Sequence, residues 1–133
     1  MPIDQSLVGR EFPPTDPYPV TSVKLREFAD ATGAAYDDKL APPTFPIVVA
    51  FEAMNGFLAD VEVDLHRIVH GEQRFAYQRP VRVGDLLTAT LTVDSLRQIG
   101  GNDILGTTSL VTDVDGALVC TTKATLIHRG EDS

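Results

Sequence analysis

The chain has 133 residues, which is enough for one compact domain that we expect to span residues 1–133 and to bury roughly two-thirds of its unfolded surface. Nineteen acidic and eleven basic side chains give a formal charge of −8, which argues against nucleic acid as a partner because phosphate binding needs clustered Lys and Arg. The sequence contains no apolar run of about 18 residues, as a membrane span needs, and its first residues lack the pattern of a signal peptide.

The first fifth of the chain is rich in proline and leads into a short amphipathic helix. The prolines predict that residues 1–20 are extended and mostly irregular. Thr21 can cap a helix over about residues 23–32, where apolar side chains form one stripe. Gly33 is suited to end this helix in the left-handed conformation.

A second and much more apolar helix is predicted over residues 47–58, with Thr44 placed to start it. Its only polar side chains are Glu52 and Asn55, which lie three positions apart and share one face. A helix this apolar is expected to be surrounded by protein. Gly56 indicates either the close approach of another backbone or early fraying.

The second half of the chain reads as strands. Apolar residues alternate with threonines from Leu87 to Asp94, which is the period of a half-buried strand. Cys120, the single cysteine, is predicted by the same alternation to be a packed small residue, and the lack of a second cysteine fits a reducing compartment. Short turns rich in Gly and Asp predict an antiparallel meander of the last three segments. The four predicted strands cover residues 67–78, 86–96, 104–113 and 118–129.

One apolar helix followed by antiparallel strands predicts an α+β fold in which the sheet wraps around a long apolar central helix. This arrangement is the hotdog fold. A single curled sheet leaves an exposed edge, and pairing two sheets edge to edge would cover it, so we expect a dimer. Together with the absence of targeting signals, these features predict a cytoplasmic protein.

Three short motifs carry a resemblance to a known family, and the likeness covers the chain from about Val8 to Arg129. As a set they resemble the N-terminal hotdog domain of MaoC-type (R)-specific hydroxyacyl dehydratases, and in particular small subunits that pair with a catalytic hotdog subunit. The motifs are APPTF at 41–45, HGEQRF at 70–75 and RPVRVGD at 79–85.

The resemblance implies where an acid and a base would lie, and neither residue is present. Active relatives carry an Asp and a His in a loop after the first helix. Counted from Gly33, this chain has Ala34 at the Asp position and Lys39 at the His position. Alanine does not titrate and a loop lysine is protonated near pH 7. Asp37 and Asp38 are expected to be solvated loop carboxylates, so we expect no catalytic residue in this chain.

Two weaker catalytic candidates remain. His70 has Glu72 and Arg74 at i+2 and i+4, and strict alternation places all three on one face, either as a catalytic group with its orienting partners or as a polar ladder at a subunit interface. Glu52, on a buried helix, is a second candidate because burial raises a carboxyl pKa. The other histidines, His66 and His128, are expected at exposed or edge positions.

The resemblance also implies a binding site for an acyl thioester at the start of the apolar helix. There the free backbone amides of Thr44, Phe45 and Ile47 are the possible donors to a thioester carbonyl, because three nearby prolines have none. No metal or cofactor is expected. The predicted substrate-binding residues are Thr44, Phe45, Phe51, Met54, Phe57 and Leu58.

These features leave three functions open. The first is a non-catalytic subunit of a (3R)-3-hydroxyacyl-ACP or hydroxyacyl-CoA dehydratase, in fatty-acid or polyketide biosynthesis, that binds the acyl chain and stabilises a catalytic hotdog partner. The second is an autonomous hotdog dehydratase or thioesterase that uses His70 or Glu52. The third is a binding module for acyl thioesters without enzymatic activity.

Overall fold

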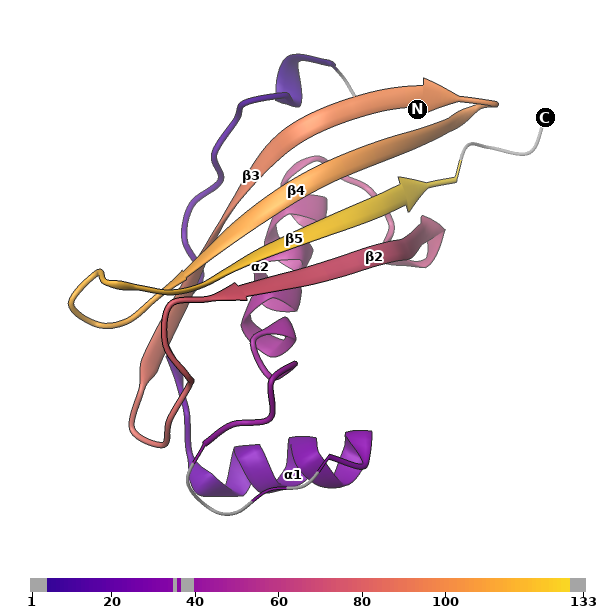
Figure 1. The fold of residues 1–133 in the computed structure, drawn as a ribbon. Coiled ribbons are helices and arrows are strands. Elements are labelled where there is room, and N and C mark those ends of the chain that lie inside the picture. Colours follow the sequence, from indigo (N-terminus) through magenta and orange to yellow (C-terminus); the bar gives the residue numbers. More distant parts are fainter. Residues whose placement is uncertain (1–4, 35, 37–39, 130–133) are drawn as a thin grey trace.

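The computed structural model describes residues 5–34, 36 and 40–129, and five strands of this part form one antiparallel sheet in the order β1-β3-β4-β5-β2. Figure 1 shows this sheet curled around α2, with α1 below it. The predicted α+β hotdog arrangement is confirmed. In chain order the elements are η1 (Gln5–Leu7), β1 (Tyr18–Pro19), α1 (Ser22–Thr32), α2 (Ile47–Asp60), η2 (Leu65–Arg67), β2 (Ile68–Tyr77), β3 (Leu86–Ile99), β4 (Asn102–Thr112) and β5 (Leu118–His128).

Helix α1 begins and ends as its sequence predicts. The Thr21 hydroxyl accepts a hydrogen bond from the Lys24 amide at 3.2 Å, which satisfies one of the free donors of the first turn. Gly33 has a φ of 72° and closes the last turn in the left-handed conformation. Leu25 and Ala29 are buried, so this helix packs through one stripe.

Helix α2 begins at Ile47, and Thr44 does not cap it. Its N-cap is Pro46, which has no side-chain hydrogen bond to the helix, and Thr44 lies in the turn before it. The helix continues through Gly56 to Asp60 without fraying. One face is buried against the sheet, but the opposite face is not covered by this chain, because Glu52 and Asn55 are exposed. The expectation of an enclosing protein shell is therefore wrong for the single chain.

The meander of β3, β4 and β5 is confirmed, with strand ends that differ from the prediction by at most three residues. Gly100 and Gly101 make the two-residue link between β3 and β4, and both have positive φ angles, 60° and 82°. This is the backbone that a tight hairpin of right-handed twist requires. In the next turn the Asp113 carboxylate accepts hydrogen bonds from the amides of Asp115 and Ala117, both at 3.0 Å.

Residues 9–20, called here the N-terminal strap, are less irregular than predicted because they run along β3. The amides of Gly9, Phe12 and Thr15 donate to carbonyls of β3 at 2.7, 2.8 and 3.0 Å. Figure 1 shows this segment rising behind the sheet on the side of β3. The strap therefore covers one edge of the sheet, whereas β2 forms the other edge.

The hydrophobic core lies between α2 and the concave face of the sheet. Phe57 of α2 meets Phe12 of the strap edge to face at 4.9 Å between ring centroids, and both rings are buried. Cys120 is fully buried in β5, as the alternation predicted. Within the described ranges, no helix is long and apolar enough to cross a membrane.

Candidate functional site

The loop in which the resemblance places the acid and the base follows α1. Ala34 is half-buried and its amide donates to the carbonyl of Ala29 at 2.9 Å, so it belongs to the closing turn of the helix. Its methyl group offers no proton donor or acceptor. Asp37, Asp38 and Lys39 lie outside the described residues.

The turn before α2 occupies most of the amides that could polarise a thioester carbonyl. The Phe45 amide donates to Pro42 O at 2.9 Å and the Ile47 amide donates to Thr44 O at 3.1 Å. Of the three predicted donors, Thr44 alone has no acceptor among the residues that the structure describes. An oxyanion site of the usual kind uses several converging donors. This turn offers one, so it is a weak place to stabilise an enolate-like state.

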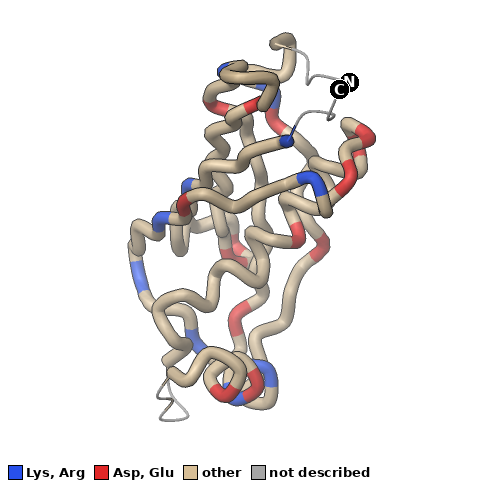
Figure 2. Tube along the Cα trace, turned by 90° about the vertical axis from the view of Figure 1, so that its right-hand side faces the viewer, with Lys and Arg blue, Asp and Glu red and all other residues tan. Residues whose placement is uncertain are grey.

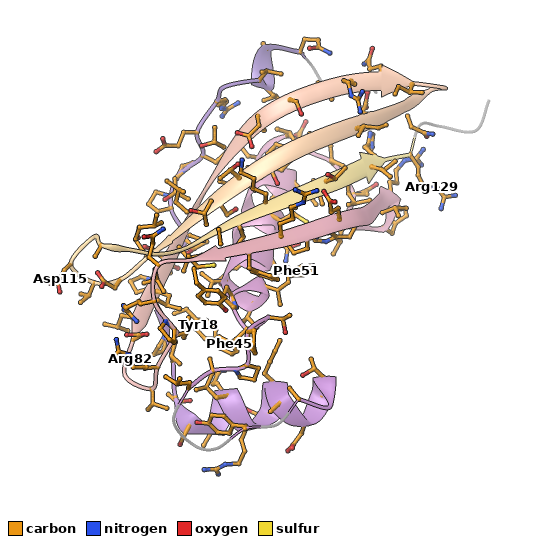
Figure 3. The ribbon with its side chains drawn as sticks, in the orientation of Figure 1. Tyr18, Phe45, Phe51, Arg82, Asp115 and Arg129 are labelled. Atoms are coloured by element: carbon orange, nitrogen blue, oxygen red, sulfur yellow. The ribbon has the colours of Figure 1, made fainter. Side chains whose placement is uncertain are left out.

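Aromatic contacts and one hydrogen bond fix this turn in place. Phe45 is buried, with its ring 5.3 Å from that of Phe28 and 6.1 Å from that of Tyr18. Figure 3 shows Tyr18 and Phe45 together in the space between α1 and the sheet. The Tyr77 hydroxyl, from the end of β2, donates to Pro43 O. Burial, followed by the charge of Cys120, raises the pKa of Tyr77 well above its usual range, which keeps this donor protonated.

A small pocket lies between α2 and the concave face of the sheet, on the side of β2. Phe51 and Met54 reach it from α2, and His70 and Gln73 reach it from β2. Its free volume is about 10 Å³, roughly the space of one water molecule. An acyl chain could enter here only after Phe51 or Met54 changed rotamer.

Two of the six predicted substrate-binding residues line this pocket, namely Phe51 and Met54. Phe51 is 41% exposed, and Figure 3 shows it beside β2. Phe45 and Leu58 are core residues that line neither this pocket nor the groove on the other side of α2, which Phe57 lines, and Thr44 is exposed in its turn. The roles of all six remain predictions.

The predicted His70–Glu72–Arg74 row does not exist, because β2 has a bulge at Gly71. His70 pairs with Leu126 and Glu72 pairs with Thr125, so the alternation slips by one residue between them. The bulge turns His70 towards the pocket together with Gln73, whose Oε1 lies 2.8 Å from His70 Nε2. Glu72 and Arg74 form an exposed ion pair at 3.1 Å instead.

Glu52 is exposed rather than buried, which corrects the argument that made it a catalytic candidate. It lines a groove between α2 and the strap, whereas His70 lines the pocket on the side of β2. The two candidate residues are therefore not part of one site.

Sequence reasoning missed the polar middle of the concave face. Thr107, Ser109 and Thr122 are buried and all three line the pocket. The Thr122 hydroxyl donates to Ser109 O at 3.3 Å. The signal was present in β4, where two successive inward positions carry hydroxyl groups between Leu105 and Val111. The pocket thus combines an apolar helix wall with a hydrogen-bonding floor.

His128 is buried and paired, so the expectation of an exposed or edge position is wrong. Its Nδ1 lies 3.1 Å from Asp103 Oδ2, with both side chains less than a tenth exposed. The pair lies at the ends of β4 and β5 and lines neither the pocket beside β2 nor the groove that contains Glu52. His66 is exposed, as predicted.

Charged groups do not gather into a metal centre or a basic face. The described part of the chain contains no group of three His, Cys, Asp or Glu side chains placed to hold a metal ion. In the view of Figure 2, Lys and Arg occur singly among the acidic residues. Among the described residues, the structure therefore offers a pocket and a groove but no metal centre.

A curled antiparallel sheet around one helix, with a pocket between the two, defines a hotdog domain. Comparison with known proteins then identifies the family. Residues 6–122 match the family described as FAS1-like, dehydratase domain region, and the chain belongs to this family.

Relatives and solved structures agree with this assignment. The chain is 40% identical over 146 residues to a UPF0336 protein of Saccharopolyspora erythraea, covering 98% of this chain and 94% of that one. It is 41% identical over 148 residues to a UPF0336 protein of Streptomyces avermitilis, covering 99% of each.

Among solved structures, the chain is similar to one in the HadBC (3R-hydroxyacyl-ACP dehydratase) complex of Mycobacterium tuberculosis. The TM-score is 0.79 and the identity 31%, over 91% of this chain and 96% of that chain. A MaoC-like dehydratase gives a TM-score of 0.80 at 26% identity, over 96% of this chain and 44% of that one. The MaoC-like resemblance seen in the motifs is thereby confirmed.

Proposed function

We propose that this chain is the non-catalytic subunit of a heteromeric (3R)-3-hydroxyacyl-thioester dehydratase, and that a catalytic hotdog partner supplies the Asp and the His. The observation that carries the proposal is Ala34, which ends α1 where the resemblance places the acid. The turn before α2 supports it, because internal hydrogen bonds occupy the Phe45 and Ile47 amides. Dehydration requires removal of a proton from the α-carbon and protonation of the departing hydroxyl, and no pair of groups near this turn is placed to do both among the described residues.

The chain would contribute shape and an interface. Phe51 and Met54 form the wall of the pocket and would contact the acyl chain. Strand β2 lies at the edge of the sheet with Val69 and Tyr77 exposed, and Phe51 is exposed beside it. An uncovered strand edge next to an exposed aromatic side chain suits a second hotdog sheet. The complex named for the similar HadBC structure supports a heteromeric assembly.

The decisive experiment compares the chain alone with the chain bound to a hotdog protein that carries the Asp/His pair and is encoded beside it. Hydration of a 2-enoyl thioester is followed for each purified species. We expect turnover by the complex, loss of turnover when the partner's Asp and His are replaced, and none by the chain alone. Robust turnover by the isolated chain would contradict the proposal.

A pair of variants tests the proposed interface. Phe51→Asp places a charge on the proposed interface, and we expect it to weaken binding of the partner and complex activity together by about tenfold or more. Val114→Asp is the control, because Val114 is 73% exposed in the β4–β5 turn. Equal effects of the two variants would show that the exposed face of α2 is not part of the interface.

A second function, an autonomous dehydratase or thioesterase, is favoured by one observation. His70 faces the pocket and Gln73 holds its ring. In that case the isolated chain would turn over its substrate and His70→Ala would abolish turnover, whereas Glu52→Gln, on the other side of α2, would not. If the isolated chain instead binds an acyl thioester without turnover, and no partner activates it, the function is that of a binding module.

A further inference from the structure

A groove of about 360 Å³ lies between the N-terminal strap and α2, on the side of the helix away from the His70 pocket. Residues 12–16 of the strap form one wall, and α2 forms the other from Glu52 to Asp60. The volume lies within the usual range for a binding site and greatly exceeds that of the pocket on the side of β2. Nothing in the proposed dehydratase function uses this groove.

Two residues that line the groove, Asp60 and Phe12, already contact a guanidinium group of the chain itself. Arg10 lies 2.8 Å from the Asp60 carboxylate, and its guanidinium carbon lies 4.5 Å from the centre of the Phe12 ring. An ion pair combined with an aromatic face is a favourable environment for a cation. Arg10 therefore shows that a guanidinium group can bind to these residues.

The rest of the groove has two further carboxylates. Asp16 lies on the strap wall and Glu52 on the helix wall, both are exposed, and neither has an ion-pair partner among the described residues. Phe57 lies buried behind them, packed against Phe12. Carboxylates on opposite walls of a groove match a basic side chain that enters between them.

The charged side chains that line the groove are all acidic. They are Asp16, Glu52 and Asp60, of which Asp60 is paired with Arg10, and no Lys or Arg is among the lining residues. An anionic phosphopantetheine or nucleotide would be repelled here, so the groove is not suited to the thioester carrier.

Gly56 supplies a further reason to expect an approaching backbone. A glycine within a helix costs roughly 0.5–1 kcal/mol relative to alanine. A Cβ atom added at Gly56 would meet nothing within 4 Å, so the fold of this chain does not require glycine at this position. Gly56 lines the groove, where the missing side chain leaves the helix backbone open to close contact.

We propose that the groove between the strap and α2 is a docking site for a lysine- or arginine-bearing segment of a protein partner, whose basic side chain lies between Asp16 and Glu52. Pro13 and Pro14 have no amide hydrogen, so the strap cannot pair with that segment as a regular strand. Recognition therefore rests on the basic side chain and on close approach of the segment to Gly56.

The test is an NMR titration of the ¹⁵N-labelled chain with the peptide acetyl-Gly-Arg-Gly-amide at low salt. We expect saturable shifts of the Thr15, Ala53 and Gly56 amides. Affinity should fall about tenfold in Asp16→Asn and in Glu52→Gln, since each loses a hydrogen bond to a charged group. Asp115→Asn, in the exposed β4–β5 turn, is the matched control and should leave the affinity unchanged.

Two further arms make the result decisive. Gly56→Leu should prevent binding by filling the groove while the thermal unfolding midpoint does not fall, and citrulline in place of arginine in the peptide should abolish the shifts. The proposal is overturned if the shifts do not saturate, if they spread equally over all acidic positions, or if the citrulline peptide binds as well. It is also overturned if free agmatine binds as tightly as the peptide, because the groove would then suit a small cation rather than a protein segment.

Discussion

The Arg79 guanidinium makes two hydrogen bonds to the Asp85 carboxylate, at 2.9 and 3.1 Å, and reaches Asp113 at 3.4 Å. Arg79 and Asp85 lie in the link between β2 and β3, and Asp113 begins the turn between β4 and β5. One arginine therefore connects two turns at the same end of the sheet. The RPVRVGD motif, which is part of the family resemblance, therefore has a structural role, because it supplies both Arg79 and Asp85.

Replacing Arg79 should destabilise the fold far more than replacing another paired arginine. Arg79 is 25% exposed and holds two partly buried carboxylates, so Arg79→Ala should lower the free energy of unfolding by about 2 kcal/mol. Arg74, which is 72% exposed in its pair with Glu72, is the control, and Arg74→Ala should cost less than about 1 kcal/mol. Urea denaturation measures both, and equal losses would show that Arg79 is not a structural link.

The same cluster predicts how stability changes in acid. Burial alone would raise the pKa of Asp85. Hydrogen bonds from the Arg79 side chain and the Arg82 amide, together with the positive charges of both arginines, outweigh burial and lower the pKa below its ordinary 3.8. Its contribution to stability is therefore complete above the unfolded-state pKa and is lost as the pH falls through the lower folded-state pKa.

Asp85→Asn removes this titration. The variant should be less stable than the wild type at pH 7, and its free energy of unfolding should fall less steeply between about pH 5 and pH 2. Urea denaturation at a series of pH values measures the slope. Parallel curves for the two proteins would contradict the assigned pKa shift.

Gly106 lies against Ser95 of β3. A Cβ atom at this position would lie 2.6 Å from Ser95 Oγ, beside the bulge where the β3–β4 register shifts. Ser95 is exposed and its hydroxyl can turn away, so Gly106→Ala should destabilise the chain by at most about 1 kcal/mol, the cost of a less favourable rotamer. Ser95→Ala leaves the neighbouring Cβ at 3.9 Å, so the double variant should recover most of the loss. A double-mutant cycle without coupling would rule out this steric cause.

The buried His128–Asp103 pair should be a major contributor to stability. His128→Ala leaves the Asp103 carboxylate without one of its buried partners, and we expect a loss of about 2–4 kcal/mol. His66→Ala, at an exposed position, should change stability by less than about 0.5 kcal/mol. The two variants can be compared by thermal unfolding, and similar midpoints would show that the pair contributes little.

Local patterns were sufficient for most of the secondary structure. Thr21 and Gly33 bracket α1 as predicted, and the alternation from Leu87 to Val93 places those side chains in the core. Such signals act within a few residues, through caps, turns and side-chain period. They also indicated the fold class, because an apolar helix followed by a meander has few ways to bury its surface.

The candidate site could not be read in the same way. The bulge at Gly71 changed which side chains share a face, so His70 joined Gln73 rather than Glu72. A bulge is set by the register with β5, about fifty residues away along the chain, and strict alternation cannot reveal it. The error over His128 has the same origin, because its partner Asp103 lies opposite on β4.

By itself, then, the sequence determined the two helices, the four long strands, their order and the hotdog class. The tertiary structure decided on which side of α2 the candidate residues lie. His70 lines the small pocket on one side, and Glu52 lines the open acidic groove on the other. Elements follow from interactions between near neighbours in the chain. Sites follow from register and burial, which depend on segments that meet only after the chain has folded.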